Sequence, residues 1–273
     1  MAGRWARPAR MALAAGLAAL VALAAVLATA GTAARPGAAP PVAHRAARPE
    51  LPPPVAPAFT PGTPRGLRDL ASRSQWAPVR RPVVARAAPA EAAPAVATLQ
   101  TLTPEGTHNL VLVRDHRTDR DGRPWVRVRL PVLPNGTLGW VPRAALGGYG
   151  TVLTRLEVDL GRLRLTLYRA GRRVLQAPVA VGSAGWPTPR GRFYIRNRLT
   201  RYASPAYGPI AFGTSARSTR ATDWPAGGFV GIHGTDQPDL IPGRVSHGCI
   251  RLRNADILRL GRLMPVGTPL TIR

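Results

Sequence analysis

One cysteine and two histidines in the C-terminal part of the chain are the side chains best suited to covalent chemistry. Cys249 is the only cysteine among 273 residues, and it lies in the run Ser246-His247-Gly248-Cys249. His233 precedes it by sixteen positions. A single thiol cannot form an internal disulfide, so in an exported chain it remains a free sulfur beside imidazoles that can deprotonate it. These residue types indicate a thiol nucleophile.

Such a nucleophile needs a base or a cation, because a thiol with a pKa of about 8.5 is mostly protonated at neutral pH. His233 and His247 are the only histidines in the second half of the chain. The residues alone leave open which is the base: His247 is close in sequence, whereas His233 needs the fold to bring it near. Gly248 would let the backbone approach a reacting carbonyl and direct N–H groups at a developing oxyanion, a contribution of about 3 kcal/mol per donor.

The same residue types allow other interpretations. A sole cysteine is often a small buried apolar residue, and a histidine can be a packed structural one. Histidine and cysteine also bind zinc, but the short paired spacing of zinc ligands is missing here. We therefore expect neither a metal nor a cofactor, and stoichiometric zinc in purified protein would contradict this expectation.

The elements that must position these residues have the pattern of β-strands. Residues 155–160 and 162–168 alternate around Gly161, which places leucines on one face and charged residues on the other. Residues 174–181 and 193–195 continue the pattern. The sequence predicts a mostly β domain, a sandwich or barrel of about 120 residues.

A short helix is expected after Cys249. Asn254 is a suitable N-cap for residues 255–260, with Asp256 in the first turn. Residues 266–272 would form the last strand. The predicted catalytic domain therefore spans residues 151–273.

A smaller β-domain is predicted at residues 96–150. Residues 125–130 alternate, an Asn-Gly turn follows at Asn135, and residues 138–142 form the expected partner strand of a hairpin. Residues 139–142 resemble the closing strand of bacterial SH3-like barrels, modules often attached to cell-wall enzymes. We expect a small SH3-like β-barrel that either binds a wall ligand or only packs against the next domain.

The N-terminal part of the chain predicts export. Three arginines precede an apolar run at residues 11–28, and small residues follow it, so residues 1–33 are expected to be a signal peptide or a membrane anchor. Residues 34–95 are rich in proline and alanine and lack apolar periodicity, which predicts a disordered, semi-rigid linker. We expect the remainder of the protein outside the cytoplasm, in the cell wall or the periplasmic space.

The chain is strongly basic, with a formal net charge of +25, and its basic residues are arginines. Nucleic-acid binding requires a recognition motif as well as charge, and no helix-turn-helix, zinc-finger or RNP pattern is present. A diffuse positive field would instead concentrate an exported protein on anionic wall polymers. We expect no nucleic-acid partner, and a membrane partner only if the N-terminal segment stays uncleaved.

The residues around the cysteine resemble a known family. Residues 232–235, 236–243 and 246–252, together with Asn254, resemble the signature of the L,D-transpeptidase catalytic domain of the YkuD type. Residues 188–195 and 208–212 are similar to that family's strand and substrate-loop segments. The resemblance covers about residues 150–273 and implies a YkuD-like β-sandwich or barrel.

The resemblance also implies a cysteine acyl-transferase of peptidoglycan. Cys249 would attack a diamino-acid carbonyl in a tetrapeptide stem, expel the terminal D-alanine, and pass the acyl group to an amine of a neighbouring stem as a 3→3 cross-link. His233 would be the general base, with the Gly234 carbonyl orienting its ring. Ser246, His247 and Gly248 would shape the thiolate pocket and the oxyanion site.

Three further residues are expected to contact the substrate, namely Arg251, Asn254 and Tyr207. Arg251 would bind a substrate carboxylate or support its loop. Tyr207 belongs to an aromatic segment that would either line a substrate groove or only fill a loop. Water as the acceptor would make the chain an L,D-carboxypeptidase, and an inert catalytic domain would leave a cell-wall-binding protein. Peptidoglycan stem peptides are the implied donor and acceptor.

Overall fold

A computed structural model of the protein describes residues 73–200, 204–220 and 228–273. The two β-sheets in these ranges belong to one compact unit, residues 58–273. The predicted signal peptide or anchor at 1–33 and the linker as far as residue 72 lie outside the described residues. Among the residues described, no helix has the length and apolar character needed to span a membrane.

Seven strands near the N-terminal end of the described chain form an antiparallel sheet in the order β3-β2-β6-β5-β4-β1-β7. The strands are β1 (Ser74–Pro78), β2 (Val83–Arg86), β3 (Ala95–Leu99), β4 (Leu110–Thr118), β5 (Pro124–Arg129), β6 (Leu138–Pro142) and β7 (Gly150–Val152), with a 3-10 turn η1 at Arg143–Ala145.

The predicted hairpin is confirmed in this sheet. β5 pairs antiparallel with β6, and Arg129 lies opposite Leu138 across the turn that contains Asn135 and Gly136. Gly136 has a φ of +92°, a backbone conformation that side-chain-bearing residues rarely adopt. Val126 and Val128 of β5 belong to the apolar core of this sheet, and Trp125 in the same strand is also only 1% exposed. The SH3-like identity of the sheet stays a prediction.

The expected boundaries of the linker and the smaller domain were wrong. β1 and β2 lie at residues 74–86, inside the range that we expected to be linker, and β7 continues the sheet past residue 150 to Val152. Each of these strands is too short to show a clear apolar period. Their few inward residues are nevertheless buried, as Ala77 and Ala85 show. Pro78 is tolerated because it ends β1.

A second sheet of ten strands follows, in the order β10-β9-β8-β17-β12-β13-β14-β16-β11-β15. Its strands are β8 (Thr154–Asp159), β9 (Arg164–Arg169), β10 (Arg172–Pro178), β11 (Ala180–Gly182), β12 (Gly191–Leu199), β13 (Ala211–Arg217), β14 (Phe229–His233), β15 (Gly243–Ser246), β16 (Ile250–Arg251) and β17 (Pro269–Ile272). Short 3-10 turns occur at η2 (Pro205–Tyr207) and η3 (Pro238–Leu240).

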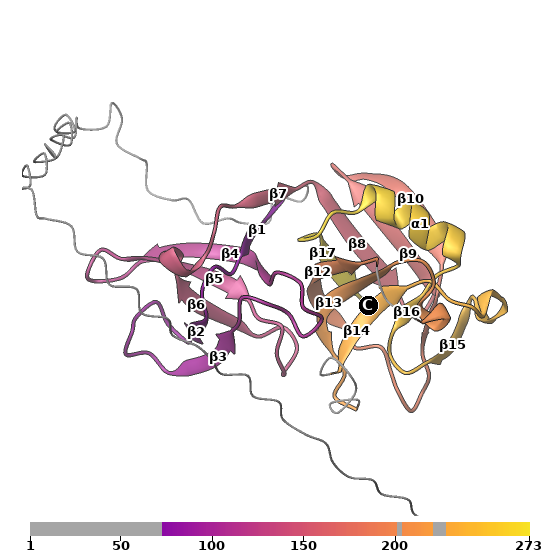
Figure 1. Ribbon diagram of the computed structural model, residues 1–273, viewed down its shortest axis with the longest axis horizontal. Coiled ribbons are helices and arrows are strands. Elements are labelled where there is room, and N and C mark those ends of the chain that lie inside the picture. Colours follow the sequence, from indigo (N-terminus) through magenta and orange to yellow (C-terminus); the bar gives the residue numbers. More distant parts are fainter. Residues whose placement is uncertain (1–72, 201–203, 221–227) are drawn as a thin grey trace, which may run out of the picture. The chain divides into compact units, whose positions relative to one another are not determined.

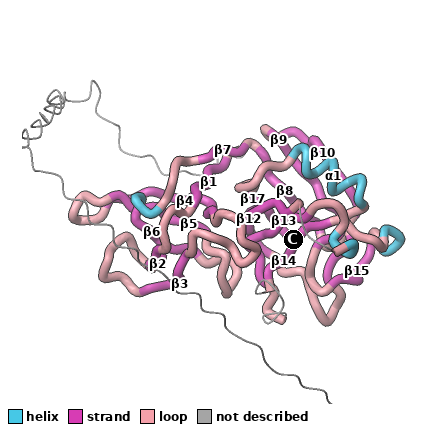
Figure 2. The backbone as a smooth tube through the Cα atoms, in the orientation of Figure 1, coloured by secondary structure: helices cyan, strands magenta, loops and turns pink. Residues whose placement is uncertain are grey.

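The core of the second sheet follows the alternation read from the sequence. β8 and β9 pair antiparallel, and Leu156, Val158, Leu165 and Leu167 are all buried in one apolar cluster. The helix α1 (Asn254–Leu263) adds Ile257 and Leu260 to that cluster. The mostly β fold with one short helix near the C-terminus is confirmed (Figures 1 and 2).

The expected cap of α1 was wrong. Arg253 is the N-cap residue, no side chain caps the helix, and Asn254 is already its first residue. The Asn254 side chain is used elsewhere, because its Oδ1 accepts a hydrogen bond of 2.9 Å from the backbone N–H of Thr235. The asparagine therefore ties the start of α1 to the loop after β14.

Candidate active site

Strand pairing brings the two predicted catalytic residues together from separate segments. β14 pairs parallel with β16, so Ile232 lies beside Ile250 and His233 beside Arg251 (Figure 1). His233 ends β14, and Cys249 immediately precedes β16. The fifteen residues between them belong to the connection between two adjacent parallel strands, which is why the distance in sequence does not separate them in space.

Cys249 and His233 line one pocket of about 210 Å³, which we call the Cys249 pocket. The described residues that line it are Ala206, Tyr207, Ser218, Gly228, Phe229, Val230, His233, Ser246, His247, Cys249 and Arg251.

Gly231 marks how close the thiol and the imidazole are. A methyl group placed on this glycine would lie 3.7 Å from Cys249 Sγ and 3.7 Å from His233 Cδ2, so both side chains border the space beside this glycine. The Gly231 N–H donates a hydrogen bond of 3.4 Å to Cys249 Sγ. Sequence reasoning did not single out Gly231.

The environment of His233 makes it a neutral base. Its side chain is 3% exposed, and its Nδ1 lies 2.6 Å from the carbonyl oxygen of Gly234. A carbonyl only accepts, so Nδ1 carries the proton and Nε2 carries the lone pair. Burial lowers the pKa of His233 to about 4, against the opposing effect of the Gly234 carbonyl. The ring of Tyr207 lies 4.7 Å from the imidazole, centroid to centroid.

The thiol is also neutral in the resting site. Burial raises the pKa of Cys249, while the Gly231 N–H and the positive charge of Arg251 lower it by less. From the sequence we expected an ionised sulfur beside the histidine. In the structure a protonated thiol instead lies beside an unprotonated imidazole. The free-energy cost of burying a charged sulfur exceeds the stabilisation that the Gly231 N–H and Arg251 give to the thiolate.

Ser246 and Gly248 fix the loop that carries the cysteine. Ser246 Oγ donates to the carbonyl oxygen of Cys249 at 2.6 Å and accepts from the Gly248 N–H at 3.1 Å. Gly248 has a φ of +111°. Thr188, which was not among the predicted site residues, completes the brace: its Oγ1 donates to the Gly248 carbonyl at 2.8 Å and accepts from the Gly182 N–H at 2.9 Å.

The remaining predicted residues divide into two groups. Arg251 and His247 line the Cys249 pocket, and the buried Nε of Arg251 has no hydrogen-bond partner among the described residues. His247 is exposed, and its ring packs edge-on against Trp186 at 5.4 Å. Asn254 does not line the pocket in the described part of the chain. It braces the backbone near Gly234 instead, so its expected contact with substrate has no support in this geometry.

The comparisons with known proteins agree with this chemistry. The family profile of the L,D-transpeptidase catalytic domain, YkuD, matches residues 153–272. The protein YkuD of Bacillus licheniformis, an L,D-transpeptidase by name, is 38% identical over 122 residues, which cover 45% of this chain and 67% of that protein. The chain belongs to the L,D-transpeptidase family. This membership implies an action on peptidoglycan in the cell wall.

Two further matches cover a smaller share of the protein that is matched. ErfK/SrfK of Salmonella typhimurium, also named as an L,D-transpeptidase, is 32% identical over 140 residues, with 45% of each chain covered. A crystal structure of an Enterococcus faecium L,D-transpeptidase is 29% identical, covers 44% of this chain and 49% of that one, and has a TM-score of 0.35. Family membership therefore rests on the sequence of the ten-stranded domain. The seven-stranded sheet lies outside the family profile.

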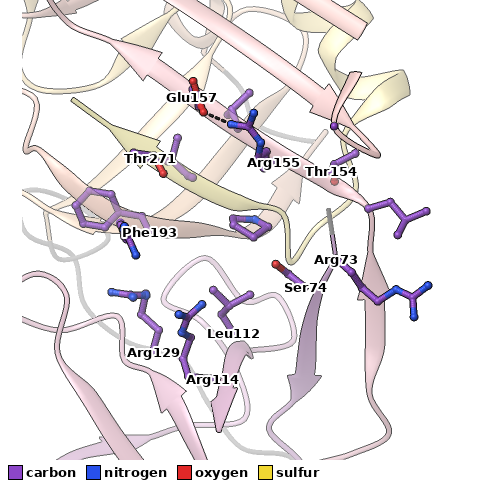
Figure 3. Close-up of a pocket in the computed structure, with 16 residues that line it drawn as sticks. Arg73, Ser74, Leu112, Arg114, Arg129, Thr154, Arg155, Glu157, Phe193 and Thr271 are labelled. Atoms are coloured by element: carbon purple, nitrogen blue, oxygen red, sulfur yellow. Dashed lines mark hydrogen bonds and ion pairs between the residues drawn. The ribbon is translucent and has the colours of Figure 1, made fainter. Parts of the chain in front are cut away.

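A second pocket of this L,D-transpeptidase-family chain has a different character (Figure 3). It measures about 240 Å³ and is lined by residues of both sheets, among them five arginines and a single acidic residue, Glu157. We call it the arginine pocket and define it by Arg73, Arg114, Arg129, Arg155 and Arg192. Glu157 forms an ion pair with Arg155, drawn as a dashed line in Figure 3. No cysteine or histidine lines this pocket.

A metal-binding cluster of side chains is absent from the described part of the chain. Within residues 73–200, 204–220 and 228–273, no three His, Cys, Asp or Glu side chains are grouped so that they could hold a metal ion.

Proposed function

We propose that the chain is an exported cysteine acyl-transferase that cross-links peptidoglycan stem peptides as 3→3 links through a thioester on Cys249. One observation carries the proposal: the thiol and the unprotonated imidazole of His233 flank Gly231 in one pocket, and the ring is fixed with Nε2 as its basic nitrogen. Membership of the L,D-transpeptidase family supplies the peptidoglycan substrate.

Acylation begins from the neutral pair. His233 Nε2 takes the thiol proton as Cys249 Sγ forms a bond to the diamino-acid carbonyl of a tetrapeptide stem. The tetrahedral intermediate collapses by breaking the C–N bond to the terminal D-alanine. The imidazolium returns its proton to the leaving amine, so D-alanine departs as a neutral amine and Cys249 holds the acyl group.

The loop before Cys249 supports the developing oxyanion. The Gly248 N–H is already bound to Ser246 Oγ, so we assign the oxyanion contact to the backbone N–H of Cys249, which lies nearest to a carbon bonded to Sγ. Ser246 and Thr188 hold the backbone on both sides of this group. Their role in the proposal is to keep the loop rigid before the substrate arrives.

Arg251 and Tyr207 are the proposed substrate contacts. Arg251 offers a buried Nε–H in the pocket, and a guanidinium binds a carboxylate through paired hydrogen bonds. Tyr207 packs on the His233 ring at the pocket wall, where it also limits access of water to the base. Deacylation mirrors acylation: the uncharged amine of a neighbouring stem attacks the thioester, and His233 accepts its proton. The C–S bond then breaks, and the imidazolium returns the proton to Cys249 Sγ.

Product analysis tests the proposal. Purified protein is incubated with disaccharide-tetrapeptides, and the products are separated and identified by mass spectrometry. We expect a cross-linked dimer together with one free D-alanine per link. Release of tripeptide and D-alanine without dimer would identify water as the acceptor and assign L,D-carboxypeptidase activity instead. Unchanged tetrapeptide would contradict both reactions.

A further inference from the structure

Two arginines of the ten-stranded sheet sit against Phe229, which lines the Cys249 pocket. The guanidinium carbon of Arg196 in β12 lies 3.7 Å from the centre of the Phe229 ring, and that of Arg217 in β13 lies 5.0 Å from it. Cations at these distances interact with the face of an aromatic ring. The position of this wall of the pocket therefore depends on how both arginines are held.

The seven-stranded domain holds the first arginine. Glu105, in the loop between β3 and β4, accepts a hydrogen bond of 2.8 Å from Arg196 Nη2. The two side chains are 14% and 1% exposed, which makes this a buried ion pair. The second carboxylate oxygen of Glu105 accepts from Asn197 Nδ2 at 3.1 Å. A buried guanidinium needs such a partner, because an uncompensated charge in this environment is strongly unfavourable.

The same domain holds the second arginine through its backbone. Asn135, at the turn between β5 and β6, donates from Nδ2 to the carbonyl of Arg217 at 2.7 Å. Its Oδ1 accepts from the Arg217 N–H at 3.0 Å. This paired contact, 82 positions apart in sequence, fixes the end of β13 from outside its own sheet.

From Arg196 a second set of hydrogen bonds leads to Val230 in the lining of the Cys249 pocket. Arg196 Nε donates to the carbonyl of Thr214 at 2.8 Å, and Thr214 Oγ1 donates to the carbonyl of Val230 at 2.7 Å. Val230 lines the Cys249 pocket and precedes Gly231, whose N–H contacts the sulfur. Both routes from the seven-stranded domain thus end on the segment between Phe229 and Gly231.

We propose that Glu105 and Asn135 are positioning residues for the Cys249 pocket, which they act on by holding Arg196 and Arg217 against Phe229. The seven-stranded domain then contributes to substrate binding, in addition to any attachment to the bacterial cell wall. This inference rests on the proposed function only for its kinetic readout. The position of Phe229 beside the reactive thiol does not depend on which reaction the chain catalyses.

The test compares Glu105→Gln and Asn135→Ala with Glu91→Gln in the full chain. Glu91 belongs to the same domain but forms only an exposed ion pair with Arg86, at 4.0 Å, so its variant is the matched control. We expect both test variants to raise KM for the tetrapeptide donor about three- to tenfold with kcat within about twofold, because the wall is displaced and the catalytic pair is not. Glu91→Gln should leave both constants unchanged.

A second readout separates this proposal from the proposed function. Cys249 is modified with iodoacetamide and with a bulky N-phenylmaleimide, and the ratio of the two rates is measured in each variant. Displacement of the wall should change the ratio at least threefold in the test variants, even if the wild-type chain turns over no tetrapeptide. If Glu105→Gln does not fold, Asn135→Ala decides. A folded variant with an unchanged ratio and unchanged KM would overturn the proposal, and so would a lowered melting temperature alone.

Discussion

The Cys249 pocket and the arginine pocket are of similar size, about 210 and about 240 Å³, but their linings suit different chemistry. The first contains a thiol and an imidazole that burial keeps uncharged. The second is bordered by five arginines and one carboxylate, and its described lining contains neither a thiol nor an imidazole. Volume and positive charge do not identify the reactive site. The reactive site is identified by a buried histidine whose proton is fixed on Nδ1, so that Nε2 carries the lone pair.

The comparison is tested most strongly by removing the base. His233→Gln keeps a polar side chain of similar size but has no basic nitrogen, so the thiol must ionise without help. We expect kcat/KM to fall by about 10²- to 10⁴-fold. Steady-state kinetics with a tetrapeptide donor measure the loss. An effect smaller than threefold would show that His233 is not the base and would return His247 to consideration.

The next largest effect should come from the arginine inside the Cys249 pocket. Arg251→Gln removes a charge-assisted hydrogen bond to substrate, which is worth about 1.5–3 kcal/mol, so KM should rise by about ten- to a hundredfold. Arg259→Gln is the matched control, because Arg259 is an exposed residue on the outside of α1. Equal effects of the two variants would indicate that general positive charge, not the position of Arg251, binds the donor.

The pH profile tests the neutral state of the pair. Burial lowers the pKa of His233 to about 4, so the imidazole stays unprotonated until the pH falls to about that value. The acid limb of kcat/KM should therefore lie near pH 4. An ordinary histidine with a pKa of about 6.5 would already lose about tenfold at pH 5.5. Rates measured between pH 3.5 and 7 distinguish these cases, and an acid limb near 6.5 would mean that the base is solvated.

The smallest effect is expected in the arginine pocket. Arg155→Gln breaks the ion pair with Glu157. The Arg155 side chain is 39% exposed and the Glu157 side chain 20%. Partly exposed pairs contribute about 1 kcal/mol or less, so thermal stability should change little. Turnover of the tetrapeptide should stay within about twofold of the wild-type rate. A large loss of turnover would show that this pocket belongs to the catalytic apparatus.

Much of the second sheet could be predicted from the sequence because its strands are long enough to alternate. The buried leucines of β8 and β9 were predicted correctly for this reason. The helix after Cys249 was also predicted, but its N-cap residue was not. The strands at residues 74–86 were missed because each has only one or two inward residues. With so few inward positions no alternation of apolar and polar residues is visible, and the proline-rich composition of residues 34–95 therefore favoured a linker.

The candidate site was predicted in its residue types but not in its electrostatics. The residues alone left the base open between His233 and His247, and only the family resemblance assigned it to His233. Parallel pairing of β14 with β16 supplies the physical reason that His233 lies near Cys249. Which ring nitrogen is basic depends on the Gly234 carbonyl, and the neutrality of the pair depends on burial. The first was implied by the family resemblance, whereas the second follows only from the packed structure. The same is true of Glu105 and Arg196, which are 91 positions apart and look like ordinary surface charges in the sequence.

The central claim is that Cys249 carries the acyl group, and intact-protein mass spectrometry tests it most directly. Wild-type protein mixed with a disaccharide-tetrapeptide donor and quenched early should gain the mass of the donor minus D-alanine, and peptide mapping should place the added group on Cys249. Cys249→Ala should gain no mass. An adduct on another residue, or D-alanine release by Cys249→Ala at the wild-type rate, would contradict the account.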